Sequence, residues 1–426
     1  MARLPHEPEP GKQATQIGDG APAQQPSEPR ALPYGRQQID AADIAAVVNA
    51  LQGDLLTTGP WVERFEQKLA ATLQAEHVVV CANGTAALHL AALGLDLGPG
   101  DTVIAPAISF LATANAARYA GADVVFADVD PHSGLMTPDT LYEAADKARR
   151  PVSAVFNVHL NGQCGDLAAL RTACGNLGAP LVNDACHALG AEYFNRPEWR
   201  PVGDGRLEAM STFSFHPVKA VAMGEGGAIA TNDAELARRL RQLRSHGMHR
   251  DEDSFALPEQ AFEPNGAARP WYYEMDALGY NYRASDLNCA LGAAQLGKLD
   301  AFIERRRALA SLYAFRLEGL DPVIRPIARN PHCKSAWHLY PVLIDFEAAG
   351  RSRANIMGLL AEEQIGTQVH YIPIYRQPYY RALYGDQFLP GAESYYARAL
   401  TLPLFPGMTE QDVERVVAAL TRAVSN

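Results

Sequence analysis

Residues 211–231 read STFSFHPVKAVAMGEGGAIAT, and the rest of the chain is organised around this stretch. Its segment Thr212–Phe215 predicts a short β-strand, and Ala228–Thr231 predicts a second one. The glycines of GEGG, between the two segments, allow a flexible turn. We therefore expect Lys219 to be held in a largely apolar turn between two strands.

A lysine in such a turn can be reactive. An apolar environment disfavours the ammonium form, which lowers the pKa of the side chain and frees the amine to attack a carbonyl group. This is Schiff-base chemistry. The alternative is an ordinary loop lysine on the surface, where most lysines lie. Other segments of the chain must therefore show which of the two interpretations holds.

Upstream of this stretch, apolar strands and helices alternate. Such a pattern is typical of a mainly parallel sheet that is covered by helices on both faces, with ligands bound at the loops that follow the strands. The fold class that we expect is therefore α/β. The expected strands are His77–Cys81, Thr102–Ala105, Val124–Ala127, Ser153–Val158 and Pro180–Val182, and the helices between them are Thr85–Leu95, Phe110–Tyr119, Pro138–Ala148 and Leu167–Cys174.

The downstream part predicts a smaller α+β domain. A helix at Asp233–Arg244 is followed by a polar, proline-containing segment, 251–270, which we expect to be a flexible excursion. Two helices within Ser285–Leu317, separated at Gly297, lead to the segments His338–Phe346 (strand), Arg353–Gln364 (helix), Thr367–Tyr371 (strand) and Glu410–Val424 (helix). The expected division is a disordered tail (1–32), a large α/β domain (33–280), and linking helices with a small C-terminal α+β domain (281–426).

Composition excludes several classes of function. The net charge of −11 argues against a general binder of nucleic acids or acidic membranes, so we expect small-molecule partners and neither nucleic acid nor membrane. The apolar runs are too short for a membrane span, and the N-terminus shows no signal-peptide pattern. The six cysteines form no C-x-x-C pair, which favours reduced thiols in the cytoplasm and no metal site.

Two further segments complement Lys219. The turn Asn83-Gly84-Thr85 lies between a strand and a helix, where free N–H groups bind an anion, although a plain turn with a threonine cap would look the same. Asp184 ends another strand, and His187 follows it; as a metal site this pair lacks a third ligand. Together the three features meet the needs of pyridoxal phosphate (PLP), with the phosphate in the turn, the carboxylate at the ring nitrogen and the lysine at the aldehyde.

Several segments resemble those of a known family. NGTAAL, DACHALGAEY, SFHPVKAVAMGEGGAIATND, RSHGM, GYNYRASDLNCALGAAQL and QVHYIPIY are similar, in this order, to the DegT/DnrJ/EryC1/StrS family of sugar aminotransferases. The resemblance implies fold type I of the PLP-dependent transferases. It also implies the following site: catalytic Lys219 and Asp184 with His187 beside them, Phe110 stacked on the ring, Gly84, Thr85 and Ser214 at the phosphate, and Asn281 reaching the phosphate from the second subunit of a homodimer.

The resemblance also implies a nucleotide-sugar substrate. It would be held by Tyr34, by the loop Asp54, Leu55, Leu56 and Thr57, and by Trp337, His338, Leu339 and Tyr340. Arg244, Arg250, Arg283, His338 and His370 are candidate cations for its phosphates and for the carboxylates of the donor.

TTGP, SFHPVK, RSHGM, WHLY and QVHYIPIY are most similar to the family members that transfer an amino group from L-glutamate to C4 of a UDP-linked 4-keto-6-deoxy N-acetyl amino sugar, in a pathway of the pseudaminic acid type. Asn83, Asn157, Cys186 and the insert at 195–206 depart from the family pattern and leave the sugar open. The alternatives are a dTDP- or GDP-linked keto sugar aminated at C3 or C4, a dehydratase of the same fold, or a non-catalytic PLP-binding regulator.

Overall fold

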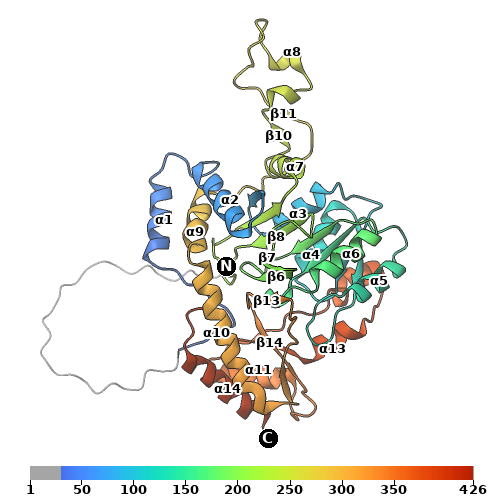
Figure 1. Ribbon diagram of the computed structural model, residues 1–426, viewed down its shortest axis with the longest axis vertical. Coiled ribbons are helices and arrows are strands. Elements are labelled where there is room, and N and C mark those ends of the chain that lie inside the picture. Colours follow the sequence, from blue (N-terminus) through green and yellow to red (C-terminus); the bar gives the residue numbers. More distant parts are fainter. Residues whose placement is uncertain (1–29, 426) are drawn as a thin grey trace, which may run out of the picture.

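The computed structural model describes residues 30–425 (Figure 1). The tail expected over 1–32 lies outside this range except for its last three residues. There the expected boundary is wrong, because Leu32 is fully buried. Its N–H donates to the carbonyl of Gln364 at 2.9 Å, and its carbonyl accepts from the N–H of Gly366 at 2.7 Å. The described part of the chain thus begins with a segment that is hydrogen-bonded to the C-terminal part.

A seven-stranded sheet forms the centre of the molecule, in the order β1-β9-β8-β5-β4-β2-β3. Strand β9 is antiparallel to both of its neighbours, and the other neighbouring pairs are parallel, which confirms the expected mainly parallel sheet. The strands are β1 (His77–Cys81), β2 (Thr102–Pro106), β3 (Asp123–Ala127), β4 (Ala154–Val158), β5 (Leu181–Asp184), β8 (Met210–Ser214) and β9 (Gly227–Thr231).

Helices cover both faces of this sheet, as the continuous apolar strands predict. In β1, Val79 and Cys81 pack into the cluster on one face, whereas Val78 and Val80 pack into the cluster on the other. The first face is covered by α3 (Gly84–Gly94), α4 (Leu111–Ala120) and α7 (Ala234–Arg244). The second face is covered by α2 (Pro60–Leu73), α5 (Pro138–Lys147), α6 (Leu167–Asn176) and α9 (Asp286–Leu296), and α1 (Ala41–Leu51) packs on α9.

The long helix α10 (Leu299–Leu317) leads from this body to a second, smaller sheet (Figure 1). This sheet has the order β12-β14-β15, and helices α11 and α14 pack together beside it. Its elements are β12 (Ile324–Pro326), β14 (Tyr340–Ile344), α11 (Arg353–Glu362), α12 (Pro378–Tyr384), α13 (Pro390–Arg398), β15 (Ala399–Leu402) and α14 (Glu410–Val424). Short 3₁₀ turns lie at Leu160–Gly162, Glu252–Ser254, Glu318–Leu320 and Ile374–Arg376.

The strand expected at Thr367–Tyr371 is wrong. Gln368 makes a single bridge to Thr401 of β15, and the residues after it leave the sheet. Residues 368–372 all line a cavity instead, although their alternation of polar and apolar side chains resembles the pattern of a strand. The division at residue 280 remains a proposal, because Leu32 and β13 (Cys333–Lys334), which pairs with β6 (Glu192–Asn195), connect the two parts across it.

No helix within residues 30–425 combines the length and the apolar character needed to cross a membrane.

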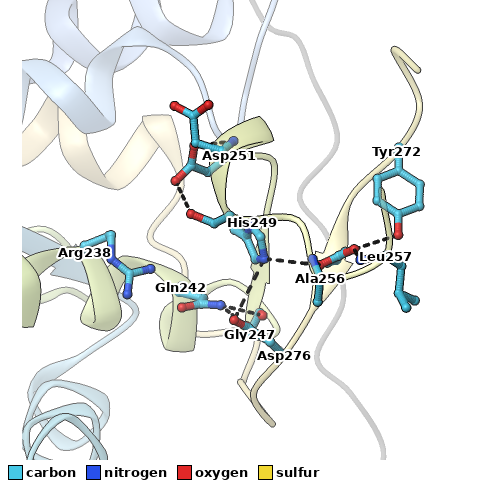
Figure 2. A network of polar contacts seen from close by, with 12 residues as sticks. Arg238, Gln242, Gly247, His249, Asp251, Ala256, Leu257, Tyr272 and Asp276 are labelled. Carbon is cyan, nitrogen blue, oxygen red and sulfur yellow. Dashed lines mark hydrogen bonds and ion pairs between the residues drawn. The ribbon is translucent and has the colours of Figure 1, made fainter. Parts of the chain in front are cut away.

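The excursion expected at 251–270 projects from the body at the top of Figure 1. It is carried by β10 (Met248–His249) and β11 (Glu274–Met275) and contains α8 (Pro258–Ala261). Figure 2 shows the polar side chains at its base, where Gln242 of α7 donates to Asp276 and to the carbonyl of Gly247. The carboxylate of Glu274 accepts from the N–H groups of residues 256 and 257 and from the hydroxyl of Tyr272. Hydrogen bonds to the carboxylate of Glu274 therefore hold several segments of the excursion together.

A buried acidic group lies just after the insert at 195–206, which contains β7 (Glu198–Pro201). Glu208 is buried and accepts from the hydroxyl of Ser211 at 2.9 Å, and its second oxygen has no hydrogen-bond partner in the described part of the chain. Burial raises the pKa of Glu208 to about 7, and the nearby carboxylate of Asp204 adds to the increase.

This raised pKa predicts that stability falls as the pH rises. The folded state binds the proton of Glu208 more tightly than the unfolded chain, whose ordinary pKa is 4.5, so this contribution is complete below pH 4.5 and is lost as the pH rises through about 7. The loss amounts to about 3 kcal/mol. Urea unfolding at pH 5 and pH 8 measures the free energy of unfolding at each pH. In Glu208→Gln the difference between the two values should be smaller. An equal pH dependence in both proteins would contradict the prediction.

Candidate active site

A cavity of about 950 Å³ opens where strands β1, β5 and β8 end at their carboxyl termini, which is the edge of a parallel sheet where ligands bind. It brings together predicted residues that are far apart in the sequence: Tyr34, Gly84, Thr85, Phe110, Asp184, His187, Ser214 and Lys219. It is also lined by residues that were not predicted as site residues, among them Ser109, Tyr282 and Tyr371.

The start of α3 forms an anion-binding turn at one end of the cavity. The side chain of Asn83 caps the helix by accepting from the N–H of Ala86 at 2.8 Å. The N–H groups of Gly84 and Thr85 remain available in the first turn, where the helix dipole favours negative charge. A Cβ atom on Gly84 would lie 2.8 Å from Cβ of Ser214, so only glycine lets the helix start so close to β8. A phosphate group fits this turn.

Asp184 lies at the end of β5 and is buried. One carboxylate oxygen accepts from the hydroxyl of Thr113 at 2.6 Å, and the other accepts from the N–H of Cys186 at 3.1 Å. Each oxygen can accept a second hydrogen bond. The carboxylate is therefore fixed in direction and can still accept from a ring N–H in the cavity.

Lys219 lies in the turn after β8, as the sequence predicts, and its backbone N–H donates to the carbonyl of His216 at 2.8 Å. Burial lowers the pKa of its side chain, and the nearby Cys186 and Asp184 oppose this effect. A larger share of the side chain is therefore the free amine than in a surface lysine, and the free amine is the form that attacks a carbonyl carbon.

His187 is neutral, and its hydrogen bonds define its tautomer. Its Nδ1 accepts from the N–H of Asn161 at 3.3 Å, so the proton lies on Nε2, which is 3.3 Å from the hydroxyl oxygen of Tyr371. Burial lowers the pKa of His187 far below its ordinary value, and the charge of Lys219 acts in the same direction. The ring of His338 lies 4.4 Å away, centroid to centroid.

Aromatic rings form another part of the cavity wall. Phe110 immediately precedes α4, and its ring lies 6.1 Å from the ring of Tyr371 and is 55% exposed, so one face is open to a flat ligand. Tyr34 lies 5.3 Å from the ring of His370.

Three of the residues that were expected to be cations at the site, His338, His370 and Arg244, do not provide a free positive charge there. Burial lowers the pKa of His370 to about 3 and that of His338 far below its ordinary value, so both are neutral. Arg244 forms an ion pair with Glu66 at 2.8 Å and donates to a backbone carbonyl at 2.7 Å, so its positive charge is already neutralised within the protein.

The residues expected at the nucleotide sugar are not brought together. Trp337, Leu339 and Tyr340 are buried in the packing around β14, where the ring of Tyr340 stacks 4.6 Å from that of Tyr313. Their side chains are therefore not exposed to a ligand in this chain, and their contact with the sugar stays a prediction. Residues 54–57 form an exposed loop between α1 and α2, and neither that loop nor His338 lines the cavity of the same chain. The expected partner contact, Asn281, lies exposed at the base of the excursion and bridges to Ser245.

The residues of the cavity fit PLP. The turn at Gly84 and Thr85 accommodates a phosphate, the buried carboxylate of Asp184 accepts from a ring N–H, and Lys219 offers a partly buried amine. Phe110 offers an open ring face beside them.

Comparisons with known proteins agree with this geometry. The profile of the "DegT/DnrJ/EryC1/StrS aminotransferase family" matches residues 37–421. The spore coat polysaccharide biosynthesis protein SpsC of Bacillus subtilis (strain 168) is 36% identical over 392 residues, which cover 91% of this chain and 96% of SpsC.

Two solved structures are similar over nearly their whole length. Helicobacter pylori PseC, an aminotransferase involved in the biosynthesis of pseudoaminic acid, has a TM-score of 0.82 and 27% identity, covering 93% of this chain and 99% of that one. The aminotransferase TlmJ from Streptoalloteichus hindustanus has a TM-score of 0.81 and 29% identity, with the same coverage. The chain therefore belongs to the DegT/DnrJ/EryC1/StrS family, and it is a PLP-dependent nucleotide-sugar aminotransferase with the type I fold.

Proposed function

We propose that this enzyme transfers an amino group from L-glutamate to C4 of a UDP-linked 4-keto-6-deoxy N-acetyl amino sugar, in a pathway of the pseudaminic acid type. The observation that carries this proposal is the similarity to PseC over 93% of the chain. The size of the cavity supports it as well, because about 950 Å³ lies at the upper end of the range for small-molecule sites and leaves space for a sugar beside the cofactor.

Bound PLP supplies an electron sink for the substrate carbon. Around it, each residue has a separate task. Lys219 would hold the cofactor through its amine and would carry a proton to or from the substrate carbon. Asp184 holds the proton on the ring nitrogen, and the turn at Gly84 and Thr85 with Ser214 anchors the phosphate. Neutral His187 presents Nε2–H in the same cavity without adding a positive charge.

The test examines the amino donor and the sugar acceptor in two separate steps. L-glutamate alone should bleach the yellow absorbance of the PLP enzyme and release 2-oxoglutarate in an amount equal to the enzyme sites. UDP-linked and dTDP-linked 4-keto sugars are then added, and amination is followed by mass spectrometry. Amination of the dTDP sugar alone would establish the alternative substrate, release of ammonia would indicate a dehydratase, and bound PLP without turnover would indicate a regulator.

We also propose a homodimer with shared active sites that works in the cytoplasm. Asn281 lies exposed outside the cavity of its own chain, where a second subunit can receive it. All six cysteines are free, as is usual for thiols in a reducing compartment.

Shared sites predict complementation between two inactive variants. Asn281→Asp places a negative charge where a partner's phosphate is expected, and Lys219→Ala removes the reactive amine. Unfolded and refolded together in equal amounts, the two should regain about one quarter of wild-type activity, because half of the dimers are mixed and each mixed dimer has one intact site. Recovery no greater than the sum of the two separate variants would contradict shared sites.

A further inference from the structure

The first turn of α4 contacts the carboxylate of Asp184 from behind the cavity. Thr113, fully buried, donates to Asp184 at 2.6 Å, and the hydroxyl of Ser109, also buried, lies 2.7 Å from that of Thr113. Thr113 lies in the first turn of α4, whereas Ser109 precedes the N-cap residue Phe110, and the segment that enters the helix brings the two hydroxyl groups together.

The direction of these hydrogen bonds follows from counting protons. An ionised carboxylate can only accept, so the single proton of the Thr113 hydroxyl points at Asp184. Ser109 must then donate to the oxygen of Thr113. Both protons point toward the carboxylate, and hydrogen bonds aligned in a chain strengthen one another in a medium of low dielectric constant.

The side chain of Thr113 is suited to holding this geometry. Branching at Cβ restricts χ1 in a helix, so the hydroxyl has few other directions in which to point. The helix is in turn tied to the aromatic wall, because the N–H of Thr113 donates to the carbonyl of Phe110 at 3.3 Å. One turn of chain therefore supports both the ring that faces the cofactor and the carboxylate at its edge.

We propose that Thr113, oriented by Ser109, is a positioning residue that keeps the carboxylate of Asp184 directed at the ring nitrogen of the cofactor. This inference rests on the proposed role of Asp184. It adds that the hydroxyl groups of Thr113 and Ser109 set the strength of the pairing.

The test compares Thr113→Val, which keeps the branched shape and loses the hydroxyl, with Thr113→Ser, which keeps the hydroxyl. Equilibrium dialysis measures PLP affinity, and a spectrophotometric pH titration measures the pKa of the lysine-bound cofactor. A buried hydrogen bond to a charged group predicts that Thr113→Val weakens PLP binding by about tenfold and shifts the titration, whereas Thr113→Ser stays within about twofold of wild type. In turnover, kcat should fall and KM for the sugar should not change.

A double-mutant cycle with Asp184→Asn shows whether Thr113 acts through the carboxylate. If it does, adding Thr113→Val to Asp184→Asn should change neither the PLP affinity nor the pKa of the lysine-bound cofactor any further. A loss in Thr113→Ser as large as that in Thr113→Val would overturn the proposal, because serine keeps the hydroxyl and lacks only the γ-methyl group. Wild-type behaviour of Thr113→Val would overturn it as well. If Asp184→Asn alone leaves both readouts unchanged, the proposed role of Asp184 itself fails, which is a different result.

Discussion

Turnover in Lys219→Ala is expected to fall by about a thousandfold or more, because the variant loses both the amine that bonds to the cofactor and the group that moves the proton at the substrate carbon. The visible spectrum provides a second readout, since the absorbance of lysine-bound PLP should be missing even when PLP is retained. Stopped-flow measurement of 2-oxoglutarate release with L-glutamate gives the rate of the first half-reaction.

The loss should be chemical and not structural. The side chain of Lys219 makes no hydrogen bond or ion pair within residues 30–425, so its removal should leave the melting temperature nearly unchanged. Lys147→Ala, at an exposed lysine in the last turn of α5, provides a matched control that should retain full activity. Full activity in Lys219→Ala would disprove the mechanism.

The second large effect is expected for Asp184→Asn. A neutral amide cannot stabilise the positively charged ring nitrogen, and removal of one aligned electrostatic partner typically lowers the rate on the order of a hundredfold. Retention of PLP should fall less than the rate, because the phosphate turn and the aromatic wall are unchanged. The two quantities are measured by single-turnover kinetics and by dialysis.

A suitable control is Asp166→Asn, at the cap of α6 outside the cavity, where asparagine caps a helix as well as aspartate does. It should leave both quantities unchanged. An unaltered rate in Asp184→Asn would show that this residue does not pair with the ring nitrogen.

The large sheet could be predicted because its signal is local. Short apolar runs between helical segments define buried parallel strands, and each strand end then marks the edge where Gly84, Asp184 and Lys219 meet. The three chemical groups follow from residue type at those ends, so the cofactor could be inferred before the structure, whereas the reaction class followed from the resemblance to the family.

The remaining parts of the site depend on contacts that the sequence does not show. His370 looks like a cation in the sequence, but burial makes it neutral. Tyr340 looks like a ligand-binding residue, but it packs inside the small sheet. The role of Thr113 arises only when α4 is placed against β5, although its spacing of four from Ser109, on either side of Phe110, is a signal that could have been followed.

The pairing of Leu32 with the segment at Ile365 has a consequence for biosynthesis. Tyr34, which lines the cavity, is held in place by residues 364–366 and by the N–H of Leu404, which donates to its carbonyl. At 5–20 residues per second, the ribosome makes Ile365 roughly 15 to 70 seconds after Leu32. The part of the cavity wall that Tyr34 forms therefore cannot take its final geometry until the chain has been made as far as Leu404.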